Sequence, residues 1–296
     1  MGILLVLICT IMWSFVSIFV KTASVMVDSF TISFFRFFFG VVFLFLIVWF
    51  RQGKVRIDWK EKWIWYGALG KASSYIFENL GISIGYAFEQ VLVNPMTMLC
   101  MMFTSIVIFR ERFTIFHAVA SFLCISGILL LKLNGLSFNH FLHTNWLVIS
   151  LFAICSIGSC VHLMSQKILI DKMNSENMNL SVFFWASFMT FTPLPFAFEP
   201  VSHGFNGWAI FALVALGFIT GVSFYIYGIG AKKISFLTSS LLLNVTVLFT
   251  LLWSYLFFDE PITLYTIAGS LLFIGGIAVV NIPTIQMMSR KRTDPA

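Results

Sequence analysis

Four polar side chains recur on one face of a hydrophobic segment in the first third of the chain. Lys71, Ser74, Tyr75 and Glu78 are spaced at i, i+3, i+4 and i+7, which places them on one side of an α-helix. A rise of 1.5 Å per residue separates Lys71 from Glu78 by about 10.5 Å, close to the length of a zwitterionic metabolite. Lys71 could therefore bind a carboxylate or phosphate, and Glu78 an amine or a coupling proton. Alternatively, neighbouring helices such as the one bearing Arg36 satisfy both charges.

Other candidate residues for a solute site lie in similarly apolar surroundings. Rings with a polar edge suit stacking and cation–π contacts, a histidine can take up a proton near neutral pH, and an asparagine beside a helix break can donate to a solute. The candidates of these kinds are Trp185, Tyr225, Tyr227, His162, Asn94 and Asn244. Pro95 frees a backbone carbonyl and is expected to bend its helix. For the asparagines and Pro95, a packing kink with an interhelical hydrogen bond is the alternative interpretation.

The elements that carry these residues must cross a lipid bilayer. Hydrophobic residues make up 59% of the 296 residues and charged residues only 10%, whereas about a quarter of a soluble domain is charged. About 17 apolar residues suffice for one helix across the bilayer. Such stretches can be drawn near 2–21, 30–50, 63–84, 88–109, 114–131, 145–166, 180–198, 207–228, 236–258 and 262–282.

The second half of the chain repeats the first. Residues 97–131 and 246–280 align at a shift of 149 residues with eleven identities, among them Glu111 with Glu260. Shared apolar composition alone would give roughly two or three identities, so an internal duplication is the better explanation. Because each half has five spans, an odd number, the two halves run through the membrane in opposite directions.

The predicted fold is therefore an all-α integral membrane protein of ten transmembrane helices in two inverted five-helix repeats. The first repeat covers residues 1–134, the second covers residues 145–284, and a basic cytoplasmic tail covers residues 285–296. Two homologous halves in a membrane protein are the usual plan of a secondary transporter, which holds its substrate where the halves meet.

The basic residues predict the orientation. Fourteen lysines and arginines fall in segments on one side of the predicted membrane, against only Lys21 and Lys132 on the other. By the positive-inside rule both termini are cytoplasmic, and the protein is expected in the cell membrane as a multi-pass chain. The net charge of +6 then reflects this orientation and contact with anionic membrane lipids, with no need for a nucleic-acid partner. Glu111 and Glu260 lie at the interfaces and are expected to cap helices or hold turns.

These features together resemble the EamA-type branch of the drug/metabolite transporter superfamily. The resemblance rests on the inverted halves and on Trp13-Ser14, Lys21, Arg36, Arg110-Glu111-Arg112 and Asp259-Glu260-Pro261. It implies transport of a small organic solute through a cavity formed by the first four helices of each half. The fifth and tenth helices would lie at the periphery or at a dimer interface, in a monomer or homodimer. Trp185 stands where a symmetric mate of Arg36 would lie, so Arg36 is expected to act in gating or charge pairing without one.

No motif for a cofactor, a metal or a nucleotide is present. The sequence has no G-x-x-x-x-G-K-[ST] loop and no Cys-x-x-Cys pair. The expected protein is therefore not an enzyme but a secondary-active carrier of a small organic metabolite, such as an amino acid or amine, working by alternating access. One rival is an efflux carrier for drugs or hydrophobic cations, which Glu78 and its aromatic neighbours would suit. Further rivals are a lipid scramblase or flippase, which needs a polar groove open sideways to lipid, and an intramembrane enzyme.

Overall fold

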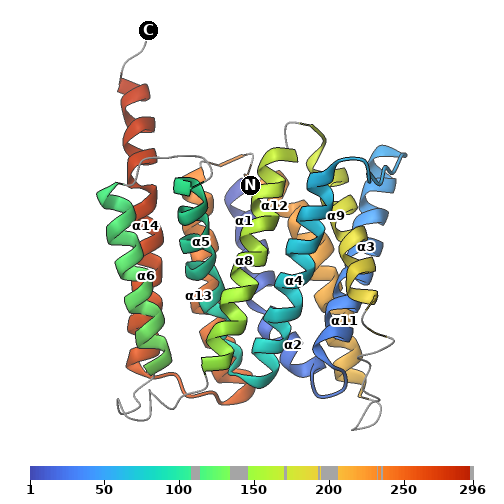
Figure 1. Cartoon of the computed structure of the whole chain (residues 1–296), viewed down its shortest axis with the longest axis horizontal. Helices are drawn as coiled ribbons and strands as arrows, with labels where there is room; N and C mark the ends of the chain where they lie inside the picture. The colour runs from blue at the N-terminus through green and yellow to red at the C-terminus, as the bar shows by residue number, and fades with distance from the viewer. Residues whose placement is uncertain are drawn as a thin grey trace.

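The chain folds into a bundle of helices (Figure 1). The computed structural model describes residues 1–107, 114–133, 146–169, 172–192, 194, 206–231, 233–234 and 236–293. Within these ranges, only the backbone is described at residues 105, 228, 231, 236–241, 244 and 280–293.

The helices follow one another in an up-and-down order (Figure 1). In the first half they are α1 (Gly2–Ser14), α2 (Val16–Ala23), α3 (Ser29–Gln52), α4 (Lys62–Ile84), the 3₁₀-helix η1 (Ala87–Leu92), α5 (Val93–Val107) and α6 (Ile115–Leu133). In the second half they are α8 (Trp146–Leu169), α9 (Ser175–Phe191), α11 (Gly207–Phe218), the π-helix η2 (Ile219–Ser223), α12 (Phe224–Ala231), α13 (Phe236–Phe258) and α14 (Leu264–Thr293).

The two ends of the bundle differ in the segments that lie there. The start of α1 and the last turns of α14 lie at one end, which we call the termini end (Figure 1). The 3₁₀-helix η1 and the connection between α13 and α14 lie at the opposite end, which we call the η1 end (Figure 1).

Helix boundaries follow from local capping. The carboxylate of Asp28 accepts hydrogen bonds from the backbone N–H groups of Phe30 and Thr31 at 2.8 and 3.0 Å, which begins α3. Gly53 ends α3 in the left-handed conformation, with φ of 63°, which costs little without a Cβ. The side chain of Asn206 caps α11 in the same way as Asp28 caps α3.

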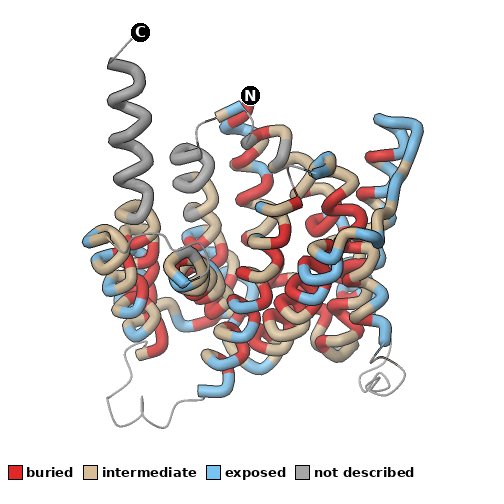
Figure 2. Tube along the Cα trace, turned by 45° about the horizontal axis from the view of Figure 1, so that its top comes forward, coloured by how far each residue is buried: buried red, intermediate tan, exposed pale blue. Residues whose placement is uncertain are grey.

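Many outward-facing side chains of the bundle are apolar. Five helices or helix pairs within the described residues are long and apolar enough to cross a membrane: Gly2–Ala23, Ser29–Gln52, Ile115–Leu133, Trp146–Leu169 and Gly207–Tyr227. Buried residues concentrate where helices face one another (Figure 2). Large hydrophobic side chains such as Phe50, Phe122 and Trp208 are instead mostly exposed, as expected for a surface in lipid.

Glycines bring several helices unusually close. A Cβ on Gly70 of α4 would lie 2.7 Å from the carbonyl oxygen of Gly158 on α8, and the reverse holds for Gly158 against Gly70. The backbones of α4 and α8 therefore touch. The glycine of α3, Gly40, similarly faces Gly217 and Gly221 of the second half.

The structure refines the predicted spans in three places. The first span is broken at Phe15 into α1 and α2, the span expected at 88–109 begins as the 3₁₀-helix η1, and the span expected at 207–228 contains the π-helix η2. Pro95 lies in the first turn of α5, where a missing N–H leaves no helical bond unmade. The change from 3₁₀ to α geometry falls just before Pro95, between Leu92 and Val93.

Candidate functional site

A cavity of about 1100 Å³ lies between the two halves of the chain. Its walls come from both halves, including Trp13 of α1, Lys71 of α4, Ser159 of α8 and Phe224 of α12. Lys167, Met173 and Ser175, where α8 ends and α9 begins, also line it, so the cavity reaches toward the termini end.

The polar face of α4 lies along this cavity. Lys71, Ser74, Tyr75 and Glu78 all contribute to its lining, as the helical spacing predicts. The hydroxyl oxygen of Ser74 lies 2.7 Å from that of Ser159 on α8. The helix α4 has the length of a membrane span, with 23 residues, but not the apolar composition, because this face is turned away from lipid.

Glu78 is held in a buried network. The guanidinium group of Arg36 lies 2.9 Å from one carboxylate oxygen of Glu78, and the side-chain amide of Gln90 donates to the other oxygen, also at 2.9 Å. Arg36 also donates to Thr220 of η2 at 3.2 Å and stacks 3.5 Å from the ring centre of Tyr75. The charge of Glu78 is thus satisfied by the helix bearing Arg36, which is the alternative that the sequence left open for this residue.

Lys71 lies in a different setting. Its ammonium group is 4.4 Å from the ring centre of Tyr75 and 5.1 Å from that of Phe224, and the residue is only 9% exposed. In the described part of the chain no carboxylate lies within ion-pair distance of it. His162, which is 2% exposed, lines the same cavity.

The other predicted site residues divide into three groups. Asn94, Tyr227 and His162 line the cavity. Trp185 does not line it: its indole N–H donates to the backbone of Asp58 at 3.0 Å, and its ring packs on Trp65. Glu111 and the side chain of Asn244 lie outside the described residues.

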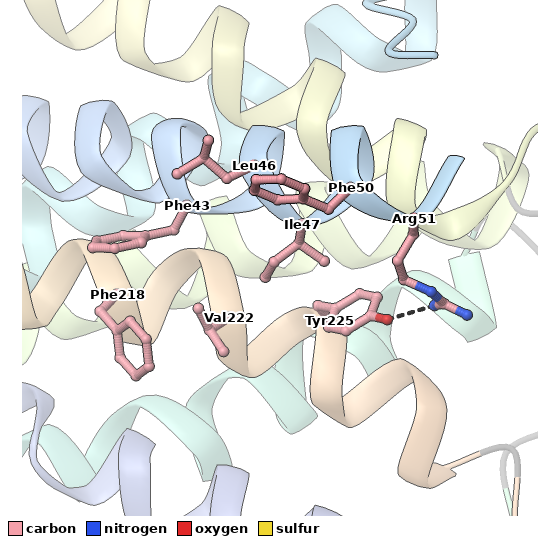
Figure 3. Close-up of a pocket in the computed structure, with 8 residues that line it drawn as sticks. All are labelled: Phe43, Leu46, Ile47, Phe50, Arg51, Phe218, Val222 and Tyr225. Atoms are coloured by element: carbon pink, nitrogen blue, oxygen red, sulfur yellow. Dashed lines mark hydrogen bonds between the residues drawn. The ribbon is translucent and has the colours of Figure 1, made fainter. Parts of the chain in front are cut away.

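Tyr225 also lies outside the cavity, because residues two apart on a helix do not share a face. It lines a separate groove of about 490 Å³ between α3 and the α11–α12 segment (Figure 3). The groove walls are otherwise apolar apart from Arg51, which donates to the hydroxyl group of Tyr225 (Figure 3). The groove therefore offers little to a polar solute.

The η1 end is closed by contacts that sequence patterns did not reveal. Glu260, 4% exposed, forms an ion pair with Lys21 of α2 at 2.6 Å. Its two oxygens also accept the backbone N–H groups of Ala87 and Phe88, at 2.7 and 3.1 Å. Glu260 therefore caps η1, a helix of the other half of the chain.

A second ion pair also involves η1, and it is buried. Lys132 at the end of α6 lies 3.1 Å from Glu89 of η1, and both side chains are less than a tenth exposed. The second oxygen of Glu89 accepts the N–H group of Tyr86 at 2.9 Å. Two charged side chains from outside η1, Glu260 and Lys132, thus bind it. No spacing in the sequence pairs residues that are 43 or 173 positions apart.

A helical bundle with an apolar outer surface, around a cavity lined by Arg36, Lys71 and Glu78, is typical of a membrane transport protein. The chain belongs to the EamA-like transporter family, whose model matches residues 1–133 and 146–282. The resemblance inferred from the glutamate turns is thereby confirmed. General membrane transport of small solutes is the function that this family shows for the chain.

Individual proteins extend the comparison. An uncharacterized transporter of Archaeoglobus fulgidus is 26% identical over 232 residues, which span 76% of this chain and 79% of the relative. A protein of known crystal structure superimposes with a TM-score of 0.68 at 17% identity, over 97% of this chain and 98% of the other. At that identity the likeness concerns the fold alone.

Proposed function

We propose that the protein is a secondary-active carrier that moves a small organic metabolite across the cell membrane by alternating access. The observation that supports this proposal best is the cavity between the halves, which reaches Lys167 and Ser175 at one end, while Glu260 binds the backbone of η1 at the other. In alternating access the two halves rock about a site near the midplane.

The orientation proposed from the basic residues gives each end a role. With both termini cytoplasmic, the η1 end faces outward and the Lys21–Glu260 pair closes the outer side. The cavity, which reaches Lys167 and Ser175, then faces the cytoplasm. In this proposal the ten spans form two inverted repeats, and the arrangement of Figure 1 is the inward-facing state.

The rival functions receive less support. Glu78 is the one carboxylate among the described residues that line the cavity, and Arg36 and Gln90 occupy both of its oxygens. This pairing counts against an efflux carrier for hydrophobic cations, which needs a carboxylate free for the cation. The groove of Figure 3 is apolar except at Arg51 and the hydroxyl group of Tyr225, which counts against a lipid scramblase, whose groove must carry headgroups.

The test is flux into liposomes that contain the purified protein. We expect uptake of a labelled metabolite that follows its own gradient or an ion gradient and needs no ATP. Dithionite quenching of labelled lipids on the same vesicles measures lipid flipping. Flipping without solute uptake would replace the carrier proposal by a scramblase.

A further inference from the structure

The charges deep in the cavity do not cancel. Arg36 and Glu78 neutralise each other at 2.9 Å, which leaves the ammonium group of Lys71. A buried charge is retained when it is paired or hydrogen-bonded, and ring contacts are a weaker substitute than an ion pair. Lys71 has two such rings, Tyr75 and Phe224, and no carboxylate partner in the described residues.

His162 adds a neutral acceptor to the same cavity. Its Nδ1 atom lies 3.2 Å from the carbonyl oxygen of Gly67, so in the neutral ring Nδ1 carries the hydrogen and donates it. The Nε2 atom is then an acceptor, and it is buried without a hydrogen-bond partner. A buried acceptor of this kind needs a donor, which a hydroxyl or amide group of a solute can supply.

An ammonium group would be a poor donor at this place. It would lie in a cavity that already holds the charge of Lys71, and the carboxylate of Glu78 is bonded on both oxygens. A phosphate monoester is poorly matched as well, since it brings a charge of about −1.5 to −2 at pH 7. Of the two lysines in the described cavity lining, only Lys71 is buried, and Lys167 is exposed. A single carboxylate balances Lys71.

Resting on the proposed carrier function, we propose that the substrate is a small organic monocarboxylate whose second polar group is an uncharged donor, such as a hydroxyl. The carboxylate binds Lys71, and the donor binds Nε2 of His162. The apolar part of the solute lies against Trp13, Phe224 and Tyr227, which line the same cavity. The preferred solute is thus a hydroxy acid, in place of an amino acid or an amine.

A matched series of probes on one carbon skeleton tests this assignment by equilibrium binding to the purified protein. The probes are 3-phenyllactate, 3-phenylpropanoate, phenylalanine and phenylalaninol. We expect affinity to fall in that order, with at least tenfold between 3-phenyllactate and phenylalaninol. Tighter binding of phenylalanine or phenylalaninol than of 3-phenyllactate, or no binding of any probe, would overturn the assignment.

Variants of Lys71 and His162 test the two proposed contacts with the solute separately. Lys71→Met should weaken 3-phenyllactate and 3-phenylpropanoate at least tenfold, whereas Lys71→Arg keeps both, and Lys167→Met at the mouth controls for general loss of positive charge. His162→Phe should leave 3-phenylpropanoate unchanged and remove the advantage of 3-phenyllactate over it. Equal losses in the Lys71→Met and Lys167→Met variants would overturn the role of Lys71. Should Lys71→Met not fold, retained binding in Lys71→Gln would overturn it as well.

Flux separates this proposal from the carrier proposal. If 3-phenyllactate binds through Lys71 but no solute crosses liposomes, the site assignment stands and the carrier function fails. If the protein carries phenylalaninol and leaves 3-phenyllactate behind, the carrier function stands and the site assignment fails.

Discussion

The ammonium group of Lys21 lies 2.6 Å from the carboxylate of Glu260, although 239 residues of sequence separate them. The same carboxylate holds the first two N–H groups of η1, at Ala87 and Phe88. One side chain thus joins α2, η1 and the α13–α14 connection. A charged group that accepts three hydrogen bonds in a buried place is a strong tie, because charge-assisted bonds are roughly twice as strong as neutral ones.

Glu260→Gln should loosen the η1 end. The amide keeps the shape of the side chain but loses the charge, and its NH₂ group would face donors. With Ala87→Cys as a reporter, we expect labelling by an impermeant maleimide to be about tenfold faster, equivalent to about 1.4 kcal/mol. Solute affinity should not change. Lys21→Arg, which keeps the ion pair, is the matched control, and equal labelling in all three proteins would contradict a closing role for Glu260.

The Arg36–Glu78 pair should show energetic coupling. Arg36→Met leaves a buried carboxylate without its ion-pair partner, which costs about 3–5 kcal/mol. The double variant with Glu78→Gln removes both charges and should recover at least about 1 kcal/mol of the summed loss. The free energies of unfolding of the parent, of Arg36→Met, of Glu78→Gln and of the double variant measure this coupling.

An exposed pair provides the control for that cycle. Lys172 and Glu61 lie 2.8 Å apart but are 48% and 35% exposed, so their coupling should stay below about 1 kcal/mol. If the buried pair couples no more strongly than this exposed pair, the network around Glu78 has no special strength.

Topology can be tested with single cysteines. Val25, in the turn before α3, is 51% exposed, and Lys54, after α3, is exposed as well. With cytoplasmic termini, Val25→Cys should react with an impermeant reagent added to intact cells, and Lys54→Cys only after lysis. The parent chain is the blank, because four of its five cysteines are buried. The reverse pattern would invert the protein and exchange its two faces.

An alanine in place of Gly70 should destabilise the contact between α4 and α8. In Gly70→Ala the new Cβ would lie 2.7 Å from the carbonyl oxygen of Gly158, so the backbones must move apart. Overpacking of this kind costs about 1–3 kcal/mol, which a thermal unfolding midpoint would reveal. Gly207→Ala is the control, since a Cβ there meets nothing within 4 Å. Equal midpoints in the two variants would mean that the helices separate freely.

Local periodicity explains which parts of the site were predictable. The face formed by Lys71, Ser74, Tyr75 and Glu78 depends only on 3.6 residues per turn, and all four residues line the cavity. The hydrogen-bond partners of those residues could not be predicted from the sequence. Gln90 bonds Glu78 from η1, and a short 3₁₀-helix has no signature in an apolar stretch.

Contacts between distant parts of the chain, and the surroundings of aromatic side chains, could not be predicted from a single sequence. The pairing of Lys21 with Glu260 depends on how two distant turns meet, which no spacing encodes. Trp185 and Tyr225 have the chemistry of cavity residues, but they face other surroundings. In a chain with 59% hydrophobic residues, the type of a side chain alone therefore does not predict whether it faces the cavity.

The π-helix η2 sets how the side chains of α12 are oriented relative to those of α11, so the number of residues in this segment matters as much as their types. A π turn holds one residue more than an α turn, so α11 and α12 are out of phase by about 100° relative to a continuous α-helix. Deleting one residue from Ile219–Ser223 would therefore turn Phe224 and Tyr227 off the cavity wall while α11 kept its glycine contact with Gly40. The extra residue of this π turn thus sets which side chains of α12 face the cavity between the halves, and a relative that is one residue shorter at this point should present different side chains to its own cavity.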